Sequence, residues 1–553
     1  VTFADGADII TASAGTSNTR VGVNAGNSIQ SGGNFNVVVG DEAGTALTTG
    51  DNNTFVGYAS GDATDDGNDN VAIGHQALSA NAGDDNVAIG KDALLVNVKN
   101  QNIAIGSHAL DSDVNGGTSV AIGHNALQAQ APATATDVHN VAVGNSAGAS
   151  VTSGKENTIV GGLAFDANTV GERNVAIGYK AQSSDVGGWK TVAIGHGALE
   201  NQNFSTATDS FNVAVGHSAG NDVTTGVRNT LIGALAGDAL TESGSNVAIG
   251  FNSMTTNTSG SDNVAVGRGT LENFNVTTTT STYNVAIGHE SGNDITTGVQ
   301  NTLIGGLAGD ALTDADRNVA LGFFALGDDT LGSRSVAVGY ASLENQNFTT
   351  ATNGYNVGLG YNTGAALTTG VRNTILGSLA LESDTLGSNS VAVGYATLNN
   401  QNFTTATDAF NTAVGSLAGL SITTGSHNTL IGAQVGDALT VGTSNIGVGY
   451  AALSSDTKGS KSVAIGRAAL NEQNFSTATD SFNVAVGHEA GLGVTTGIKN
   501  VIVGANAGDA LTTGTKNVAI GYLAQSADTK GFQNVAIGTA ALGSQNFTTE
   551  VSS

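Results

Sequence analysis

The fold is decided by the stretch Asn70-Val71-Ala72-Ile73-Gly74, one copy of a pattern that returns 30 times along the 553 residues of the chain. The first copy begins at Asn18 and the last ends at Gly538, and the usual spacing is 17 residues. A short, fixed period is typical of one structural unit stacked on itself. We therefore expect an all-β chain, a parallel β-solenoid (β-roll) of about 30 coils.

The alternation within the pattern predicts a short strand. The second position is Val, Ile or Thr in all 30 copies, and the fourth is Val, Ile or Leu. Side chains two residues apart share one face of a strand, so we expect these positions to form the buried face. The fifth position is always Gly, which indicates a turn with positive φ or a place without room for a side chain. Seventeen residues then allow two short strands and two turns.

The third position points to the opposite face, where a strand that met water would carry polar residues. It is Ala in most copies and a larger apolar residue in several others. Such a long apolar stripe exceeds what a soluble monomer exposes, so either a second strand of the same chain or identical chains must cover it. We predict a homo-oligomer whose interface includes Ala72, Ala176, Leu231, Leu303, Ile375, Leu430 and Ile502.

The composition excludes several classes of protein. A net charge of −27, from 45 acidic and 18 basic residues, argues against a nucleic-acid-binding protein, which needs a basic surface. There is one Pro, which excludes collagen, and no Cys, which excludes disulfide bonds and thiol chemistry. No apolar run has the length of a membrane helix. Since the chain begins at Val1 and stops inside another repeat, we interpret it as a piece of a longer protein.

A longer period lies above the coil and divides the chain into three regions. From Asn140 onward, three coils of 17 residues and one of 21 make groups of 72 residues, although the group from Asn356 to Asn411 has lost a coil. Residues 140–553 hold these groups and are truncated at the C-terminal end, and residues 18–139 hold less regular coils. Residues 1–17 are expected to cap the solenoid or to continue a preceding region.

The extra residues of the longest coil fall in one loop, of which residues 203–211 are a typical copy. Most copies carry two aromatic residues, in a chain that is only 5% aromatic. Such loops are candidate contact surfaces, and the alternative is that both rings fold back and close their own loop. The candidate ligand-contact residues are Phe204, Phe211, Phe348, Tyr355, Phe403, Phe410, Phe475 and Phe482.

Nine basic residues stand just before the strand pattern, and we expect them to pair with Asp residues of adjacent coils. They are Arg173, Lys190, Arg228, Arg317, Arg334, Arg372, Lys461, Lys499 and Lys516.

No arrangement of residues predicts an enzyme or a cofactor. The sequence lacks a nucleophile elbow, a phosphate loop and a Cys–His pair. A glycosidase with paired carboxylates stays open as an alternative, although the Asp residues occupy repeat positions rather than departing from the repeat. Six of the nine His follow the unvarying Gly at a position that also accepts Tyr, Phe and Arg, which disfavours metal binding. The acidic turn at residues 63–69 could hold a weakly bound Ca²⁺.

The pattern Asn-Val-Ala-Ile-Gly-x-x-Ala resembles the Ser-Val-Ala-Ile-Gly-x-x-Ser repeats in the heads of YadA-like trimeric autotransporter adhesins. The copies that begin at Ser335 and Ser462 are nearest, and the repeats are also similar to those of some phage tail fibres. The resemblance implies a left-handed roll, three chains side by side, and display on a bacterial surface for binding to host matrix or cells. The family's coil is typically shorter than 17 residues, and its neck, stalk and membrane anchor are missing from this chain.

The leading functional prediction is a trimeric extracellular fibre, on a cell or virion surface, that binds a surface glycan or protein. A purely structural filament or a phage tail-fibre shaft subunit is the alternative. Ice binding through Thr368 and Thr369 is a third hypothesis, but neighbouring coils do not repeat these Thr residues. We expect identical chains as partners, no nucleic acid, and no membrane insertion in this segment.

Overall fold

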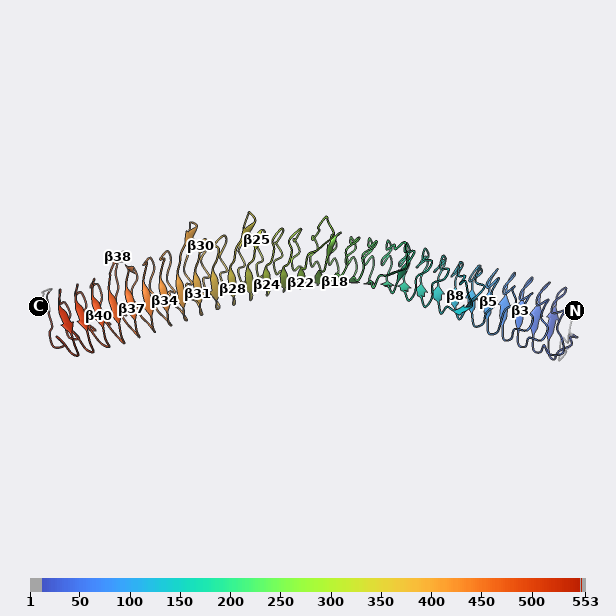
Figure 1. Cartoon of the computed structure of the whole chain (residues 1–553), viewed down its shortest axis with the longest axis horizontal. Helices are drawn as coiled ribbons and strands as arrows, with labels where there is room; N and C mark the ends of the chain where they lie inside the picture. The colour runs from blue at the N-terminus through green and yellow to red at the C-terminus, as the bar shows by residue number, and fades with distance from the viewer. Residues whose placement is uncertain (1–11, 548, 550–553) are drawn as a thin grey trace, which may run out of the picture. The chain divides into compact units, whose positions relative to one another are not determined.

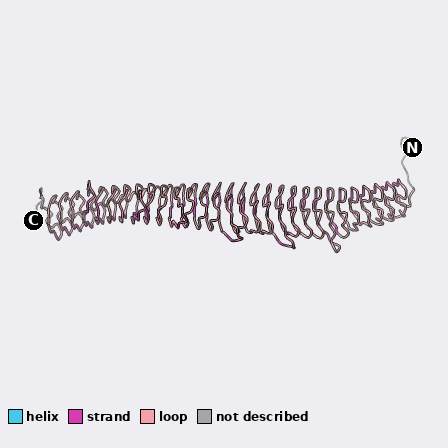
Figure 2. Tube along the Cα trace, turned by 90° about the horizontal axis from the view of Figure 1, so that it is seen from above, coloured by secondary structure: helices cyan, strands magenta, loops and turns pink. Residues whose placement is uncertain are grey.

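The computed structural model describes residues 12–547 and residue 549, so that most of the predicted N-terminal cap lies outside the described residues. The described chain contains strands, turns and loops but no helix (Figure 2). It divides into two compact units: unit 1 is residues 1–269 with 275–281, and unit 2 is residues 270–274 with 282–553. Each unit is a parallel β-solenoid with one three-residue strand per coil, which confirms the predicted fold class (Figure 1).

The strands of unit 1 all lie at the second to fourth positions of the pattern. They are β1 (Thr19–Val21), β2 (Val37–Val39), β3 (Thr54–Val56), β4 (Val71–Ile73), β5 (Val87–Ile89), β6 (Ile103–Ile105), β8 (Val120–Ile122), β10 (Val141–Val143), β11 (Thr158–Val160), β12 (Val175–Ile177), β14 (Val192–Ile194), β16 (Val213–Val215), β17 (Thr230–Ile232), β18 (Val247–Ile249) and β20 (Val264–Val266).

The strands of unit 2 occupy the same positions of the pattern. They are β22 (Val285–Ile287), β23 (Thr302–Ile304), β24 (Val319–Leu321), β26 (Val336–Val338), β28 (Val357–Leu359), β29 (Thr374–Leu376), β31 (Val391–Val393), β33 (Thr412–Val414), β34 (Thr429–Ile431), β35 (Ile446–Val448), β37 (Val463–Ile465), β39 (Val484–Val486), β40 (Val501–Val503), β41 (Val518–Ile520) and β42 (Val535–Ile537).

Two-residue strands form separate pairs where a long loop passes the preceding coil. The pairs in unit 1 are β7 (Gly116–Gly117) with β9 (Thr136–Asp137), β13 (Gly188–Trp189) with β15 (Thr208–Asp209), and β19 (Gly260–Ser261) with β21 (Thr280–Ser281). The pairs in unit 2 are β25 (Gly332–Ser333) with β27 (Thr352–Asn353), β30 (Gly387–Ser388) with β32 (Thr407–Asp408), and β36 (Gly459–Ser460) with β38 (Thr479–Asp480).

Equivalent positions of successive coils stand directly on one another. In the pairing of β12 with β14, Val175 lies opposite Val192 and Ala176 opposite Ala193. The same parallel register holds in unit 2, where β28 and β29 place Val357 opposite Thr374. A residue at one position of the pattern therefore belongs to a column that runs from coil to coil.

The buried face and the outward face of the strand are exchanged relative to the prediction. The third position is buried in every described strand except β1, whereas the second and fourth positions are half-buried or exposed throughout. The residues predicted at an oligomer interface are fully buried inside the single chain, so they cannot contact a partner, and this prediction is wrong. They are Ala72, Ala176, Leu231, Leu303, Ile375, Leu430 and Ile502.

The chain's own far wall covers the third position, because the coil is narrow. Ala77 and Leu78 follow the strand β4 and are fully buried beside Ala72. This wall is a stacked turn and not the predicted second strand, although Leu78 N donates to Ala93 O of the next coil at 2.9 Å. An interior filled from the far side by Leu leaves room for only a small residue on the strand.

Several coils with a large third residue carry Gly on the far wall. Leu231 occupies the third position of its coil, and Gly237 stands where other coils carry Leu. A Cβ atom added to Gly237 would lie 2.7 Å from Leu231 Cδ2 and 2.8 Å from Leu240 Cδ1. The Gly of the far wall therefore makes room for Leu231 in this coil, whereas Ile375 and Leu381 of another coil are both large and fully buried.

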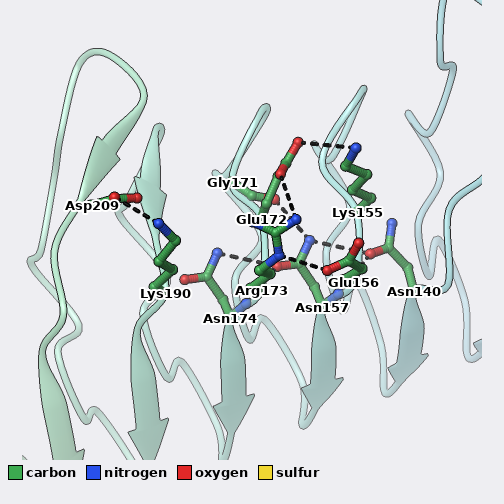
Figure 3. Close-up of polar contacts among 10 residues, drawn as sticks. All are labelled: Asn140, Lys155, Glu156, Asn157, Gly171, Glu172, Arg173, Asn174, Lys190 and Asp209. Atoms are coloured by element: carbon green, nitrogen blue, oxygen red, sulfur yellow. Dashed lines mark hydrogen bonds and ion pairs between the residues drawn. The ribbon is translucent and has the colours of Figure 1, made fainter.

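A ladder of buried Asn side chains joins successive coils between the long loops (Figure 3). The backbone nitrogens of Asn157 and Asn174 donate to the Oδ1 atoms of Asn140 and Asn157, one coil earlier, at 3.0 and 2.9 Å. Asn157 Nδ2 donates forward to Gly171 O at 2.9 Å. Each Asn of the ladder thereby satisfies two backbone groups one turn further along the chain, which the buried interior would otherwise leave without partners.

The unvarying Gly is required by the closeness of the next coil as well as by its conformation. Gly377 has φ of +132°, and a Cβ atom there would lie 2.4 Å from Gly394 O. Both of the explanations predicted for this Gly therefore hold at once.

Candidate functional site

The long loops expose one of their two aromatic rings and bury the other. The first ring of each loop is 4–6% exposed, so it cannot reach a ligand, and the prediction of ligand contact is wrong for Phe204, Phe348, Phe403 and Phe475. The alternative, in which a ring closes its own loop, describes these four. The second ring is 47–51% exposed in Phe211, Tyr355, Phe410 and Phe482, which stay candidates for ligand contact.

A buried Asp anchors the start of the long loops, except at residues 275–283, where Asn257 takes its place. Asp185 Oδ1 accepts hydrogen bonds from Gly188 N and Phe204 N, both at 3.1 Å. Its Oδ2 accepts from Gln202 Nε2 at 2.9 Å, and Gln202 Oε1 accepts from Asn212 Nδ2 at 2.8 Å. The Asp therefore fixes the turn, and the Gln connects it to the Asn ladder of the next coil.

The same Asp–Gln pair recurs at every long loop of the 72-residue groups in unit 2. Its copies are Asp329 with Gln346, Asp384 with Gln401, and Asp456 with Gln473. Burial raises the pKa of these Asp carboxyls and of Asp185 above 3.8, although the hydrogen bonds that they accept oppose the shift. Sequence reasoning missed these residues, and the signal that could have found them is the Gln of Gln-Asn-Phe, 17 residues after an Asp.

The exposed second ring stands beside a cation or an imidazole of a neighbouring coil. Lys190 Nζ lies 5.2 Å from the centre of the Phe211 ring, and Lys461 Nζ lies 5.2 Å from that of Phe482. Such distances are typical of cation–π contacts. Each ring is therefore held at the surface by a stacked neighbour and not by burial.

The predicted pairing of the nine basic residues with acidic ones holds for only some of them. Arg173 Nε lies 2.7 Å from Glu156 Oε2, and Lys190 Nζ lies 2.7 Å from Asp209 Oδ2 (Figure 3). Lys461 Nζ lies 2.6 Å from Asp480 Oδ2, whereas the carboxylate 4.0 Å from Arg317 is that of its sequence neighbour Asp316 and not of an adjacent coil. Within the part of the chain that the structure describes, no carboxylate lies within 4.0 Å of Arg228, Arg334, Arg372, Lys499 or Lys516.

A second aromatic column follows the unvarying Gly. In unit 2, Tyr340 stacks on Tyr361 at 5.4 Å between ring centres, and in unit 1 His196 stacks on His217 at 5.2 Å. The exposed fractions of Tyr340 and Tyr361 are 51% and 52%. The His residues of this column therefore belong to a stacked surface ladder.

The acidic turn at residues 63–69 does not gather carboxylates into a cage. Among residues 12–547 and 549, no group of three or more His, Cys, Asp or Glu side chains is placed to hold a metal ion. A weakly bound Ca²⁺ at this turn stays a hypothesis.

Comparison with known proteins returned no relative. A scan of protein-family models found no match, and searches of curated proteins and of solved structures also returned none. The resemblance to adhesin heads and tail fibres therefore stays a prediction. Of the described residues, none lies in a helix that is long and apolar enough to cross a membrane.

Proposed function

We propose that the chain is a scaffold without catalytic activity, the repeat segment of an extracellular fibre. In this proposal three chains pack side by side through the second and fourth positions of their strands, which we call the outward stripe. The exposed loops then bind a glycan or a protein on a surface.

The outward stripe is the observation that carries the proposal. Its Val, Ile, Leu and Thr side chains recur on every coil and are nowhere fully buried. Leu321, Leu359 and Ile431 are 42–45% exposed. A row of this length is more apolar surface than a soluble monomer normally presents, and identical chains offer a matching row with the same coil spacing. The resemblance to adhesin heads supports the number three and the location on a surface.

The mass of the chain in solution tests the assembly. We expect light scattering to give three times the chain mass of 54.6 kDa. Substituting Leu321, Leu359 and Ile431 by Lys should dissociate the trimer, because charges on the stripe would be buried without partners. The matched control places Lys at Thr350, Thr405 and Thr477, which are exposed loop residues. A monomeric wild-type chain, or a stripe variant that stays trimeric, would contradict the proposal.

Binding of the intact fibre to arrays of glycans and matrix proteins tests the adhesive part. We expect at least one specific ligand, held through the exposed rings of the long loops. A trimer that binds nothing on either array would favour the purely structural filament.

A further inference from the structure

One column of unit 2 carries no acidic residue, although the whole chain has 45 acidic and 18 basic residues. This edge column consists of the residue immediately before the first position of each coil. Its members in unit 2 are Tyr283, Gln300, Arg317, Arg334, Tyr355, Arg372, Asn389, Phe410, His427, Ser444, Lys461, Phe482, Lys499, Lys516 and Gln533. In unit 1 the same column includes Asp69, Asp85, Glu156 and Asp262. The edge column of unit 2 is therefore a local exception to the charge of the chain.

At two places along this column an aromatic residue stands between basic residues of the preceding and the following coil. The strand register that places Val336 opposite Val357, and Val357 opposite Thr374, also aligns Arg334, Tyr355 and Arg372. Backbone hydrogen bonds continue the alignment outside the strands, because Arg372 N donates to Gly354 O at 2.8 Å. Neighbouring coils lie about 4.8 Å apart, so the two cations that flank the ring are about 10 Å apart.

The triplet of Arg334, Tyr355 and Arg372 leaves both cations available. Arg334 Nη1 donates to Tyr355 Oη at 2.7 Å, and its guanidinium lies 5.8 Å from the centre of the ring. The loop carries Asn353 where the Phe482 copy carries Asp480, which pairs with Lys461. Both Arg side chains are exposed, and Tyr355 is 47% exposed. The triplet therefore presents one ring face between two cations that no described carboxylate neutralises.

A second triplet further along unit 2 repeats the order of residues, but in it Asp480 pairs with Lys461, so that Lys499 is the cation without a described carboxylate partner. Phe482 lies between Lys461 and Lys499 in the register of β37, β39 and β40, and Lys516 follows. All four residues have φ between +50° and +60°. This left-handed conformation suits Asn, Asp and Gly best, so bulky side chains are held here at a conformational cost.

We propose that the edge column of unit 2 binds a polysaccharide that carries carboxylate or sulfate groups. The exposed rings would stack against the C–H faces of sugar rings, whose positive hydrogens complement the negative ring face. The flanking Arg and Lys would bind the acidic groups through charge-assisted hydrogen bonds. Repeated triplets on one stack of coils would engage a linear polymer at several points.

A polysaccharide fits this edge better than a nucleic acid does. Duplex DNA carries one charge about every 1.7 Å, and binding requires many cations around it. The edge column offers a single row of cations, about 5–10 Å apart within its basic stretches, on an otherwise acidic chain. The inference rests on the proposed function, because it names the ligand class of the same fibre.

Binding of the full chain to immobilised heparin, hyaluronan, dextran and duplex DNA tests the proposal. We expect binding to heparin or hyaluronan that weakens with added salt, and no binding to dextran. Replacing Arg334, Arg372 and Lys499 by Gln should lower the affinity by at least about tenfold. The matched control replaces Lys458, Arg467 and Lys530 of unit 2 by Gln, with the same loss of charge and no loss of affinity.

Two further variants separate ring contacts and charge from general effects. Replacing Tyr355 and Phe482 by Ala should weaken binding about fivefold or more. The matched control replaces Tyr361 and Tyr395, which are 52% and 55% exposed in the other aromatic column. Exchanging Arg334 and Arg372 for Lys should preserve binding. This result would show that the Gln variant binds weakly because it has lost charge and not because it has lost its fold.

The outcomes distinguish this inference from the fibre itself. Equal binding to dextran, equal or tighter binding to DNA, or an unchanged affinity after the triple Gln substitution would overturn the inference. A chain that is trimeric but binds neither heparin nor hyaluronan would overturn it and leave the fibre standing. A monomeric chain that binds heparin or hyaluronan through the edge column would overturn the trimeric fibre and leave this inference standing.

Discussion

Asn356 Oδ1 accepts a hydrogen bond at 2.9 Å from the backbone nitrogen of Asn373, the residue that takes its place in the next coil. Asn373 repeats the contact, since its Oδ1 accepts from Ser390 N at 2.9 Å and its Nδ2 donates to Gly387 O at 2.9 Å. The side chain of one coil thus replaces water for the backbone of the next. Stability is passed along each unit in steps of one coil, as expected of a one-dimensional stack.

Removing one member of the ladder should open the solenoid locally. Asn373→Ala leaves Ser390 N and Gly387 O buried without these partners, at a cost of about 1–3 kcal/mol each. We expect faster amide exchange in the coils on both sides of residue 373. Asn345→Ala is the control, because Asn345 is exposed and donates only to Ala365 O. Equal exchange in the two variants would show that the buried ladder is not required.

The unvarying Gly should be irreplaceable inside a unit but not at the last described coil. In Gly377→Ala the new Cβ meets Gly394 O at 2.4 Å, so the coils must separate, at a cost of at least about 3 kcal/mol. Gly538 has a similar φ, +122°, but no described atom within 4 Å of its Cβ position. Gly538→Ala should therefore cost only the conformational strain, about 1–2 kcal/mol. Local amide exchange measures the loss of stability in both variants. Equal losses in Gly377→Ala and Gly538→Ala would contradict a steric role for the Gly.

Two adjacent residues of β29 should respond in opposite ways to truncation. Ile375 is fully buried in the coil, so Ile375→Ala should cost about 2–5 kcal/mol of local stability. Leu376 points outward, so Leu376→Ala should change the stability of the single chain by less than about 1 kcal/mol. Amide exchange of the flanking coils at high dilution compares them. A larger loss in Leu376→Ala would restore the face assignment predicted from the sequence.

Acid should stabilise the coil that carries Asp185. Burial raises the pKa of this carboxyl above 3.8 in the folded chain, so the folded state binds more protons than the unfolded state just above that pH. The free energy of unfolding therefore falls as the pH rises from about 4 toward the folded pKa. The single tryptophan, Trp189, lies one residue after the turn that Asp185 anchors, and its fluorescence reports the local transition in urea.

Asp185→Asn provides the control for this pH dependence. The amide does not titrate, so the urea midpoint reported by Trp189 should vary less with pH than in the wild-type chain. At low pH the other acidic residues also lose their mutual repulsion, and this effect on stability is the same in both chains. The same pH profile in both would show that the buried carboxyl is not responsible.

The sequence predicted the coil, its strand and its Gly, because all three depend on neighbours in the chain or on the repeat itself. It failed on the direction of the strand faces. Alternation separates Ala72 from Val71 and Ile73 but does not say which side is inside. That choice depends on the volume of Leu78 on the far wall, a contact across the coil that no strand pattern contains.

The candidate site was predicted only in outline, for the same reason. Aromatic spacing located the loops, yet Phe204 is buried and Phe211 exposed because Asp185, from the preceding coil, binds the backbone of Phe204. The pairing of basic residues depended likewise on single substitutions in adjacent coils. Asn353 in place of an Asp leaves Arg334 beside Tyr355 and not beside a carboxylate.

The strand contacts of each coil within a unit reach only the coil before it and the coil after it. A genetic exchange between two copies of the repeat therefore adds or deletes whole coils, and the new junction has the same chemistry as the old one. The group from Asn356 to Asn411 is one coil shorter than its neighbours, yet its strands keep the same register. Length is then a trait that recombination can adjust in steps of about 4.8 Å without any change in the architecture.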